Sequence, residues 1–355
     1  MSGRPVVVFA VPDGIDDPAR VSGGNVYDRR LAESLRPDGW EVRLLPVPDA
    51  PAALETALAG VPDDAVVLVD GLLVQREPAA LPDQSGRLRF VVLAHMPPPK
   101  DGPGVRDAFR SARRIVATSA WTRSELIAQD AAEPARIVVA HPGTDAAAAA
   151  SLPSAAGGRL LCVGVVTPHK GQDVLLAALA AARDVPGWTC TIAGSTATEP
   201  GFAAELRAAV AAAGLGDRIR FAGVLSGSGL GDAYAGADLL VAPSRGESYG
   251  MAVAEALARG IPVVASAVGG IPEAIAGGRG AVTVPPGDAW ALERVLRRWW
   301  ASAEWRAELA TAARDARADR PGWADTAATV GRALREVADE ARAAHPGPVG
   351  TAARS

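Results

Sequence analysis

Two glutamates flank a short stretch in which a polar loop turns into a helix. Glu247 and Glu255 are separated by seven residues, and the helical pattern begins near Ser248. If both glutamates were helical, eight steps of about 100° would leave their side chains roughly 80° apart, so they cannot share one helical face. We therefore expect Glu247 in the loop and Glu255 one to two turns inside the helix, roughly 7–10 Å along its axis.

The backbone between these carboxylates is suited to an anion. The N–H groups of Tyr249, Gly250 and Met251 lie in the first turn of the predicted helix, which ends at Arg259, so no carbonyl within the helix accepts from them. They also lie at the positive end of the helix dipole. Such a helix start binds phosphate. With a hydroxyl-binding carboxylate on each side, the stretch matches a nucleotide diphosphate-sugar, whose hydroxyls lie at both ends and whose charge lies in the middle.

A plainer explanation of the two glutamates is the alternative. Glu247 would then cap the helix and Glu255 would lie on a solvated helix face. Glycines lie on both sides of the stretch, at Gly246 and at Gly269–Gly270. These flexible loops favour the binding site over the structural explanation.

Length and composition describe a globular protein. A chain of 355 residues suggests two domains of ordinary size, and 49% of its residues are hydrophobic while 21% are charged. The net charge of −4 gives no reason to expect a nucleic-acid partner. Cys162 and Cys190 fall in apolar runs, so we interpret both as buried free thiols, from which no metal cluster of Cys and His can be assembled.

The chain contains no sign of a membrane span. No apolar stretch reaches the 18 or more residues of a spanning helix, and the run from Val6 to Val11 lacks a cleavage pattern, so it is interpreted as a first strand. We expect the protein in the cytoplasm. The basic run from Arg106 to Arg114 is interpreted as a solvated helix face, but contact with an acidic acceptor or with the inner membrane surface stays open.

Short β-branched strands alternate with helical stretches along most of the chain. This alternation implies βαβ units and parallel sheets. A stretch with few bulky residues, 146 to 158, is interpreted as a linker between two sets of such units. The predicted strands are 5–11, 41–45, 65–70, 90–94, 115–118 and 136–140 before the linker, and 160–166, 188–193, 218–221, 238–242, 261–265 and 281–284 after it.

Further candidate residues follow predicted strands, where ligands of open α/β sheets collect. His95 ends one strand and precedes three prolines that stiffen its loop. Gly23 and Gly24 precede a helix predicted from about Asn25 to Leu35, where backbone N–H groups can approach an anion. The plainer explanation of His95 is a surface histidine that ends a strand. The plainer explanation of Gly23 and Gly24 is a flexible loop tip.

The stretch from Ser244 to Glu273 resembles the signature of the retaining family-4 glycosyltransferases, the glycosyl transferases group 1. Members have the GT-B fold, with two facing Rossmann-like domains, parallel sheets and an interdomain cleft. The resemblance implies that Glu247 binds the donor sugar, that Glu255 binds the ribose, and that the backbone from Ser248 to Met251 binds the diphosphate. It extends over nearly the whole chain and is strongest from 160 to 290.

The resemblance also assigns residues outside this stretch. It places Gly23 and Gly24 beside the donor phosphate and His95 near the donor sugar and the reacting centre. Lys170 and Gly171 match a Gly-Arg…Lys-Gly element that clamps the diphosphate, although Lys170 alone would pass for an exposed lysine.

The cationic clamp of the family is incomplete in this sequence. Val165 occupies the position where the family has an arginine. Half of the expected positive charge is therefore missing from its usual place. Lys170 together with the helix N–H groups is one substitute, and Arg245 is another.

The resemblance implies four segments: an acceptor-side domain over 1–148, a donor-binding domain over 159–322, a helix over 323–344 that crosses back to the first domain, and a disordered tail over 345–355. The predicted activity is that of a retaining hexosyltransferase, which moves a sugar from a nucleotide diphosphate-sugar to an acceptor hydroxyl. Glu247, His95 and Lys170 are the expected catalytic residues, and domain closure would bring His95 and the Gly23–Gly24 loop onto the donor.

No metal site and no cofactor are expected besides the donor substrate. The acceptor stays open among a glycan, a lipid and a small molecule, and the sequence predicts no particular oligomeric state. Two alternatives remain: a nucleotide-sugar epimerase, for which His95 alone offers acid–base chemistry, and a non-catalytic nucleotide-sugar-binding protein, which the valine at 165 makes conceivable.

Overall fold

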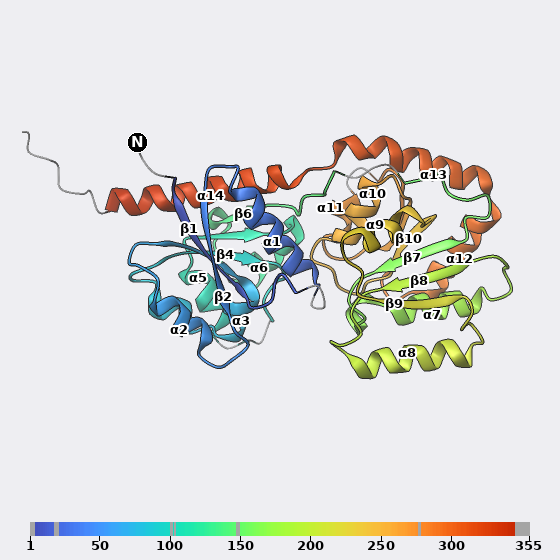
Figure 1. The fold of residues 1–355 in the computed structure, drawn as a ribbon, viewed down its shortest axis with the longest axis horizontal. Coiled ribbons are helices and arrows are strands. Elements are labelled where there is room, and N and C mark those ends of the chain that lie inside the picture. Colours follow the sequence, from blue (N-terminus) through green and yellow to red (C-terminus); the bar gives the residue numbers. More distant parts are fainter. Residues whose placement is uncertain are drawn as a thin grey trace, which may run out of the picture. The chain divides into compact units, whose positions relative to one another are not determined.

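A computed structural model describes residues 4–17, 21–99, 102, 104–146, 150–275 and 278–344 of the chain. Contacts between residues divide it into two units (Figure 1). The first unit combines Met1–Gly14, Asp28–His141 and Ala324–Ser355, and the second combines Ile15–Tyr27 and Pro142–Trp323. Among the described residues, no helix has both the length and the hydrophobicity that crossing a bilayer requires.

The first unit contains a parallel sheet in the strand order β2-β1-β3-β4-β5-β6, as far as the described residues show. Residues of β3 and β4 are buried along their whole length, as expected of parallel strands that helices cover on both faces. The strands are β1 (Val6–Pro12), β2 (Glu41–Val47), β3 (Val66–Asp70), β4 (Arg89–Ala94), β5 (Arg114–Ala117) and β6 (Ile137–Val139).

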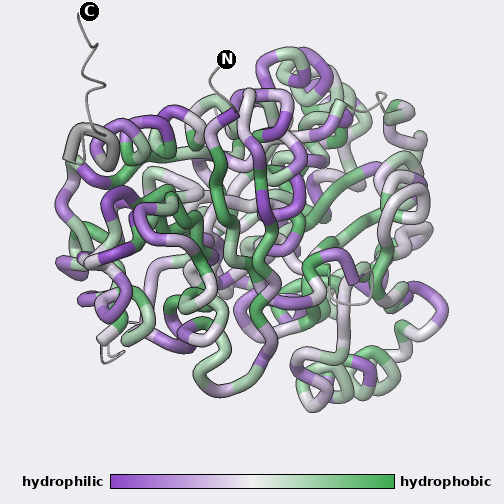
Figure 2. The backbone as a smooth tube through the Cα atoms, turned by 60° about the vertical axis from the view of Figure 1, so that its left-hand side comes forward, coloured by the Kyte–Doolittle hydropathy of each residue, from purple (hydrophilic) through white to green (hydrophobic). Residues whose placement is uncertain are grey.

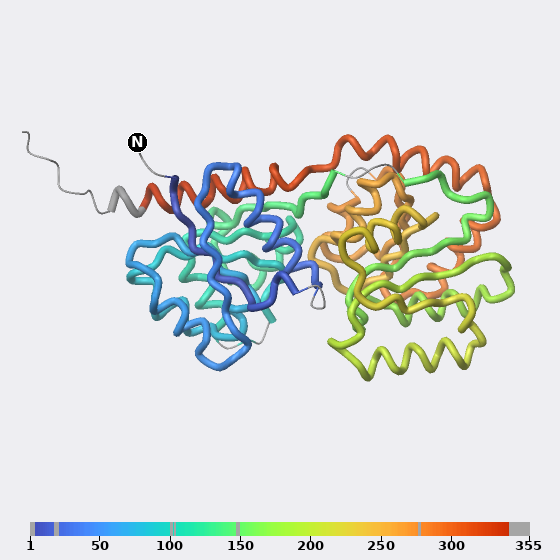
Figure 3. Tube along the Cα trace, in the orientation of Figure 1, coloured from blue at the N-terminus to red at the C-terminus, as the bar shows by residue number. Residues whose placement is uncertain are grey.

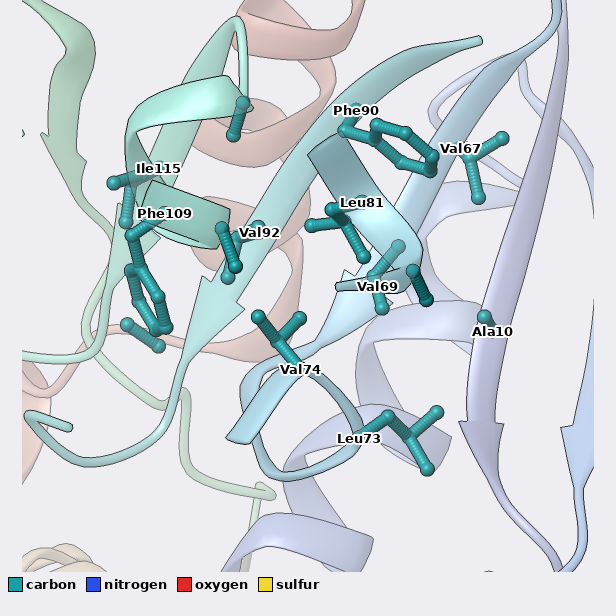
Figure 4. Packing of buried hydrophobic residues seen from close by; sticks show 14 of the residues in the cluster. Ala10, Val67, Val69, Leu73, Val74, Leu81, Phe90, Val92, Phe109 and Ile115 are labelled. Carbon is teal, nitrogen blue, oxygen red and sulfur yellow. The ribbon is translucent and has the colours of Figure 1, made fainter. Parts of the chain in front are cut away.

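Helices alternate with these strands and cover the sheet. Figure 4 shows part of the resulting core, in which side chains of β3 and β4 lie beside those of the short helices. Phe90 and Phe109 are almost fully buried there, and each such side chain stabilises the fold by about 1.5–3 kcal/mol. The helices are α1 (Gly23–Leu35), α2 (Ala53–Ala59), α3 (Gly71–Arg76), α4 (Ala80–Gln84), α5 (Val105–Ser111), α6 (Ala120–Ala128), η1 (Pro134–Arg136) and α14 (Trp323–Ala344).

The second unit repeats this plan with the strand order β12-β11-β10-β7-β8-β9, all parallel among the described residues. Figure 3 follows the chain of this unit from green through yellow to orange. The chain leaves β7 on one side and later returns to β10 on its other side. The carboxyl ends of β7 and β10 therefore form the point where the winding direction reverses, which is the usual ligand site of such sheets. The strands are β7 (Arg159–Val163), β8 (Thr189–Ala193), β9 (Ile219–Gly223), β10 (Leu239–Ala242), β11 (Val263–Ser266) and β12 (Ala281–Val284).

Amphipathic helices complete the second unit. Hydrophobic residues follow the strands in both units, and hydrophilic residues gather on outer turns and helices (Figure 2). The helices are η2 (Pro168–Lys170), α7 (Gln172–Ala181), α8 (Pro200–Ala212), α9 (Gly227–Ala235), α10 (Met251–Ala258), α11 (Ile271–Ile275), α12 (Ala289–Ala301), α13 (Ala303–Asp315) and η3 (Ala316–Asp319).

The predicted α/β class with two parallel-sheet units is confirmed, but some boundaries differ. α1 starts at Gly23, two residues before the predicted start, so both glycines of the Gly23–Gly24 pair belong to its first turn. α10 starts three residues late, because Gly250 takes a left-handed conformation (φ 101°) that a helix cannot continue through. Parts of the predicted linker (147–149) and the predicted tail (345–355) lie outside the described residues.

A buried carboxylate at the start of β10 fixes the entry to the second sheet. Asp238 accepts hydrogen bonds from the backbone N–H (2.8 Å) and the hydroxyl (2.7 Å) of Ser154, and from the N–H (2.8 Å) and guanidinium (2.6 Å) of Arg159. Burial acts to raise the pKa of Asp238, but the bonds from Arg159 and Ser154 outweigh it and lower that pKa.

Replacing this carboxylate should destabilise the protein. We expect Asp238→Ala to lower the free energy of unfolding by roughly 1–3 kcal/mol, because it leaves partly buried donors of Ser154 and Arg159 unpaired. Urea unfolding at pH 7 measures the loss, and Asp232→Ala, at an exposed position, serves as the control. Since folding lowers the pKa of Asp238, the difference from wild type should persist above the ordinary value of 3.8 and shrink as the pH falls below it. A difference that stayed constant down to pH 2 would contradict this account.

Candidate active site

Lys170 and Glu247 meet at the carboxyl end of the second sheet. Lys170 ends η2 after β7, and Glu247 lies in the loop after β10, the neighbouring strand. The Nζ of Lys170 is 2.6 Å from Oε2 of Glu247, and only 24% and 15% of the two side chains are exposed. Water screens such a partly buried, charge-assisted hydrogen bond less than it would screen one at the surface. The structure thus brings together two of the predicted site residues.

Close backbone packing positions these two side chains. Gly171 is left-handed (φ 69°), and a Cβ at this position would lie 2.1 Å from the carbonyl oxygen of Pro243, so only glycine fits. The N–H groups of Arg245 and Gly246 donate to the carbonyl of His169, at 2.7 and 3.3 Å. The loops that carry Lys170 and Glu247 are therefore joined through their main chains.

The second glycine loop holds the backbone around Glu247. Gly269 is left-handed (φ 56°), and a Cβ there would lie 1.8 Å from the carbonyl oxygen of Glu247. The N–H of Gly270 donates to that same oxygen at 3.0 Å, and a Cβ on Gly270 would lie 2.1 Å from the carbonyl oxygen of Ser248. The sequence singled out this loop, but it did not show that the loop supports the glutamate.

The start of α10 presents unpaired donors. Gly250 is its N-cap, and the first helical bond runs from the N–H of Ala254 to the carbonyl of Gly250. No other described residue accepts a hydrogen bond from the N–H groups of Gly250 or Met251. The side chain of Tyr249 is buried and packs in the core, while the prediction concerns its backbone N–H.

The Gly23–Gly24 pair lies in the first turn of α1, and residues 15–27 group with the second unit. A Cβ added to Gly23 would be 3.6 Å from the Sδ of Met251, the first residue of α10. The start of α1 therefore lies beside the start of α10.

Glu255 is the fifth residue of α10, and its side chain contacts a tyrosine. The hydroxyl of Tyr234 donates to its Oε2 at 2.9 Å, and the guanidinium of Arg259 lies 4.6 Å from the centre of the Tyr234 ring. Burial and then the carboxylate of Glu255 raise the pKa of Tyr234, so its hydroxyl stays a donor at neutral pH. Glu255 is half-buried rather than on a solvated face. Nothing in the sequence pointed to Tyr234.

Arg245, a candidate to replace the missing arginine, is held by α7. Its guanidinium makes two bonds to the carboxylate of Asp173 (2.7 and 2.5 Å) and one to the carbonyl of Pro168 (2.8 Å). This fork-like pairing leaves less of the guanidinium for a phosphate. Lys170 is therefore the better candidate for the cation beside the diphosphate.

The first unit contains a buried acidic cluster around His95. The Nε2 of His95 is 2.8 Å from Oδ1 of Asp28 and 3.8 Å from Oδ2 of Asp70. Both carboxylates are completely buried, and 8% of His95 is exposed. Ligand atoms of the three lie within 4.8 Å of one another.

Sequence reasoning found His95 but missed both of its acidic neighbours. Asp70 ends a predicted strand at the ligand-binding edge of the sheet, and this position was the available signal. Asp28 lies inside α1, where an aspartate resembles any polar residue on a helix face. Only the folded chain shows that it is buried.

A protein-family model, curated proteins and solved structures are similar to this chain. The family model of the glycosyl transferases group 1 matches residues 157–302. The D-inositol 3-phosphate glycosyltransferase of Mycolicibacterium vanbaalenii is 35% identical over 221 residues, which are 55% of this chain and 47% of that protein. The chain spans about half the length of the curated relatives it matches.

Two solved structures share the fold. Sucrose-phosphate synthase from Thermosynechococcus elongatus has a TM-score of 0.79 at 21% identity, and the match covers 95% of this chain and 100% of that one. Anabaena HepE in complex with UDP-glucose has a TM-score of 0.76 at 18% identity, over 93% and 99% of the two chains.

Two Rossmann-like units with parallel sheets, together with these structural matches, define a protein of the GT-B fold. Within that class, the match over residues 157–302 and the relatives named as glycosyltransferases support a glycosyltransferase of the family-4 type, the glycosyl transferases group 1. The family that the sequence resembles is therefore confirmed.

Adding a methyl group to the glycine loop should disturb the backbone of Glu247. We expect Gly269→Ala to lower the melting temperature by several degrees, because it adds a clash with the Glu247 carbonyl to the cost of a left-handed alanine. Gly287→Ala isolates the backbone cost of roughly 1 kcal/mol, since φ is 77° there and no atom lies within 4 Å of the new Cβ. Gly216→Ala, which has neither feature, is the neutral control. Equal shifts for Gly269→Ala and Gly287→Ala would show that the clash is relieved at no cost.

Proposed function

We propose that this chain transfers a sugar from a nucleotide diphosphate-sugar to an acceptor hydroxyl and retains the anomeric configuration. One observation carries the proposal: Lys170 and Glu247 pair at 2.6 Å at the reversal point of the second sheet, in the loops that lead to α7 and α10. A cation and a carboxylate at this edge supply what a donor needs, a partner for its diphosphate and one for its sugar hydroxyls. The match to the glycosyl transferases group 1 supports this assignment.

The chemical problem of the reaction is the departing diphosphate. When the bond from the anomeric carbon to the phosphate oxygen breaks, the diphosphate takes the electron pair, and its negative charge grows. The ammonium of Lys170 and the N–H groups at the start of α10 would stabilise that charge. In this scheme the protein supplies the positive charge itself, so we propose that neither a metal ion nor a cofactor takes part.

The carboxylate of Glu247 would accept hydrogen bonds from sugar hydroxyls. Retention requires the acceptor to attack the face that the diphosphate vacates, and a glutamate that holds the sugar need not act as a nucleophile. The hydrogen bond from the Nζ of Lys170, at 2.6 Å, would hold the Glu247 carboxylate in place for these contacts. Glu255, whose carboxylate is held by the Tyr234 hydroxyl, would accept from the ribose.

The remaining predicted residues keep the roles that the family resemblance implies. Gly23 and Gly24 would let backbone N–H groups approach the diphosphate, as would Gly171, and His95 would act near the donor sugar. The names of the similar proteins supply the first substrates to test. They are UDP-glucose, bound by HepE, and D-inositol 3-phosphate, named for the curated relatives.

A donor screen tests binding before any acceptor is known. We expect one class among uridine, guanosine and adenosine diphosphate sugars to raise the melting temperature, since a ligand at about 100 times its Kd stabilises by roughly 2.7 kcal/mol. Radiolabelled donor of that class is then incubated with candidate acceptors. Label on an acceptor supports transfer, whereas a converted sugar nucleotide would indicate an epimerase, and binding without turnover would indicate a binding protein.

Removing the charge of Glu247 should impair transfer without unfolding the protein. We expect Glu247→Gln to lower kcat by about 100-fold or more, a size typical for the loss of one charged contact at a reacting centre. Its melting temperature should stay close to that of wild type, because the backbone around position 247 is fixed by Gly269 and Gly270. Glu205→Gln, at an exposed position of α8, is the matched control. Near-normal transfer by Glu247→Gln would refute the role given to this residue.

A further inference from the structure

The cluster of Asp28, Asp70 and His95 has a chemistry that the proposed reaction has not used. We infer that Asp28 and Asp70 are positioning residues, which share a proton and hold the ring of His95 in its charged, imidazolium form at neutral pH. The significance of this charge for catalysis rests on the proposed function. The proton distribution itself is a property of the folded chain and can be measured without substrate.

The hydrogen-bond geometry fixes one side of the imidazole ring. Oδ1 of Asp28 lies 2.8 Å from Nε2 of His95, and an ionised carboxylate can only accept, so Nε2 carries a proton. Asp70 approaches the same nitrogen from β3 with Oδ2 at 3.8 Å, while its Oδ1 accepts from the N–H of Leu72 at 2.6 Å. Both acids thus act on the same side of the ring.

Close packing brings Asp70 to the end of β4. Asp70 is the N-cap of α3, and Gly71 follows it. A Cβ on Gly71 would lie 2.8 Å from the carbonyl oxygen of Leu93, so the glycine lets the start of α3 approach the strand that ends in His95. Asp28 reaches the ring from α1, and the three groups lie next to the reversal point between β1 and β3.

Charge balance determines where the protons lie. Two buried carboxylates this close cannot both stay ionised at low cost, because their negative charges repel and water screens them little. One ionised carboxylate, one carboxylic acid and one imidazolium together carry no net charge, which is the least costly state for buried groups. Oδ2 of Asp28 and Oδ2 of Asp70 are buried with no hydrogen-bond partner among the described residues, so a proton has two acceptor atoms available there.

The pKa shifts agree with this distribution. Burial, and then the charge of Asp28, raise the pKa of Asp70 to about 8, so Asp70 is the protonated acid at pH 7. Burial acts to lower the pKa of His95, but Asp28 and then Asp70 outweigh it and raise that pKa to about 9.

The charged groups that act on His95 are Asp28 from α1 and Asp70 from the end of β3. The neighbouring β5 leads into Thr118, whose uncharged hydroxyl donates to the backbone carbonyl of His95 at 3.3 Å. The ring therefore presents a positive charge at the carboxyl end of β4.

Titration of the histidine rings tests the inference directly. The sequence has four histidines, so 13C-labelled imidazole signals of the full chain can be followed from pH 5 to 10, and His95→Gln assigns the signal. We expect His95 of the wild type to stay protonated beyond pH 8. A His95 signal with a midpoint at or below 6.5, the ordinary value, would overturn the inference whatever the variants do.

Variants separate the two acids. Asp28→Asn should lower the His95 midpoint by at least about one pH unit, because it removes the ionised partner. Asp70→Asn should lower it less, because Asp70 lies 3.8 Å from Nε2 whereas Asp28 lies 2.8 Å from it. Asp28→Glu keeps the charge and should restore the midpoint at least in part, whereas Asp83→Asn, exposed in α4, is the control. An unchanged midpoint in Asp28→Asn would refute the role of Asp28.

Two further measurements distinguish a proton-sharing cluster from a cation site and link its charge to transfer. If Mg²⁺ or Zn²⁺ shifted the His95 signal at one equivalent and a chelator reversed the shift, the cluster would be a cation site and the inference would fall.

If transfer is found, the alkaline limb of kcat against pH should move to lower pH in Asp28→Asn and recover in Asp28→Glu. Absence of transfer with a raised His95 midpoint would refute the proposed function and leave this inference standing.

Discussion

The pairing of Lys170 with Glu247 is the interaction on which the candidate site depends. It joins the loops after two neighbouring parallel strands, β7 and β10, at the edge of the second sheet where the winding direction reverses. Neither side chain could hold this position by itself, since both are carried by loops. Three glycines make the geometry possible, because Gly171, Gly269 and Gly270 let main chains approach to distances that any Cβ would prevent.

Hydrophobic periodicity and the alternation of strands with helices were the parts of the fold that the sequence could predict. The β-branched runs of β3, β4 and β11 are short and continuous, as strands covered on both faces must be, and all twelve predicted strands occur in the described residues. Helix starts were harder to predict, because they depend on single backbone conformations. The left-handed Gly250 delays α10, while the Gly23–Gly24 pair, interpreted as a loop, joins the first turn of α1.

Within the candidate site, residues with a motif could be found and residues without one could not. Glu247, Glu255 and Lys170 lie at family spacings, so the sequence pointed to them. Tyr234 and Asp28 contact site residues from other elements of the chain, 21 residues from Glu255 and 67 residues from His95. A contact of this kind arises only when helices pack on a sheet, and no local pattern marks it. Arg245 is a further case, since its charge suggested a phosphate contact and the sequence did not show its pairing with Asp173.

The support of Glu247 by main-chain groups has a consequence for how such a site can change. Gly270 binds the carbonyl oxygen of Glu247, and the clearance at Gly269 involves the same oxygen, so neither contact depends on which side chain position 247 carries. The scaffold and the chemical selectivity of the loop are thus encoded by different residues. Evolution or a protein engineer can therefore exchange the side chains that face a sugar while the backbone contacts of the loop stay the same.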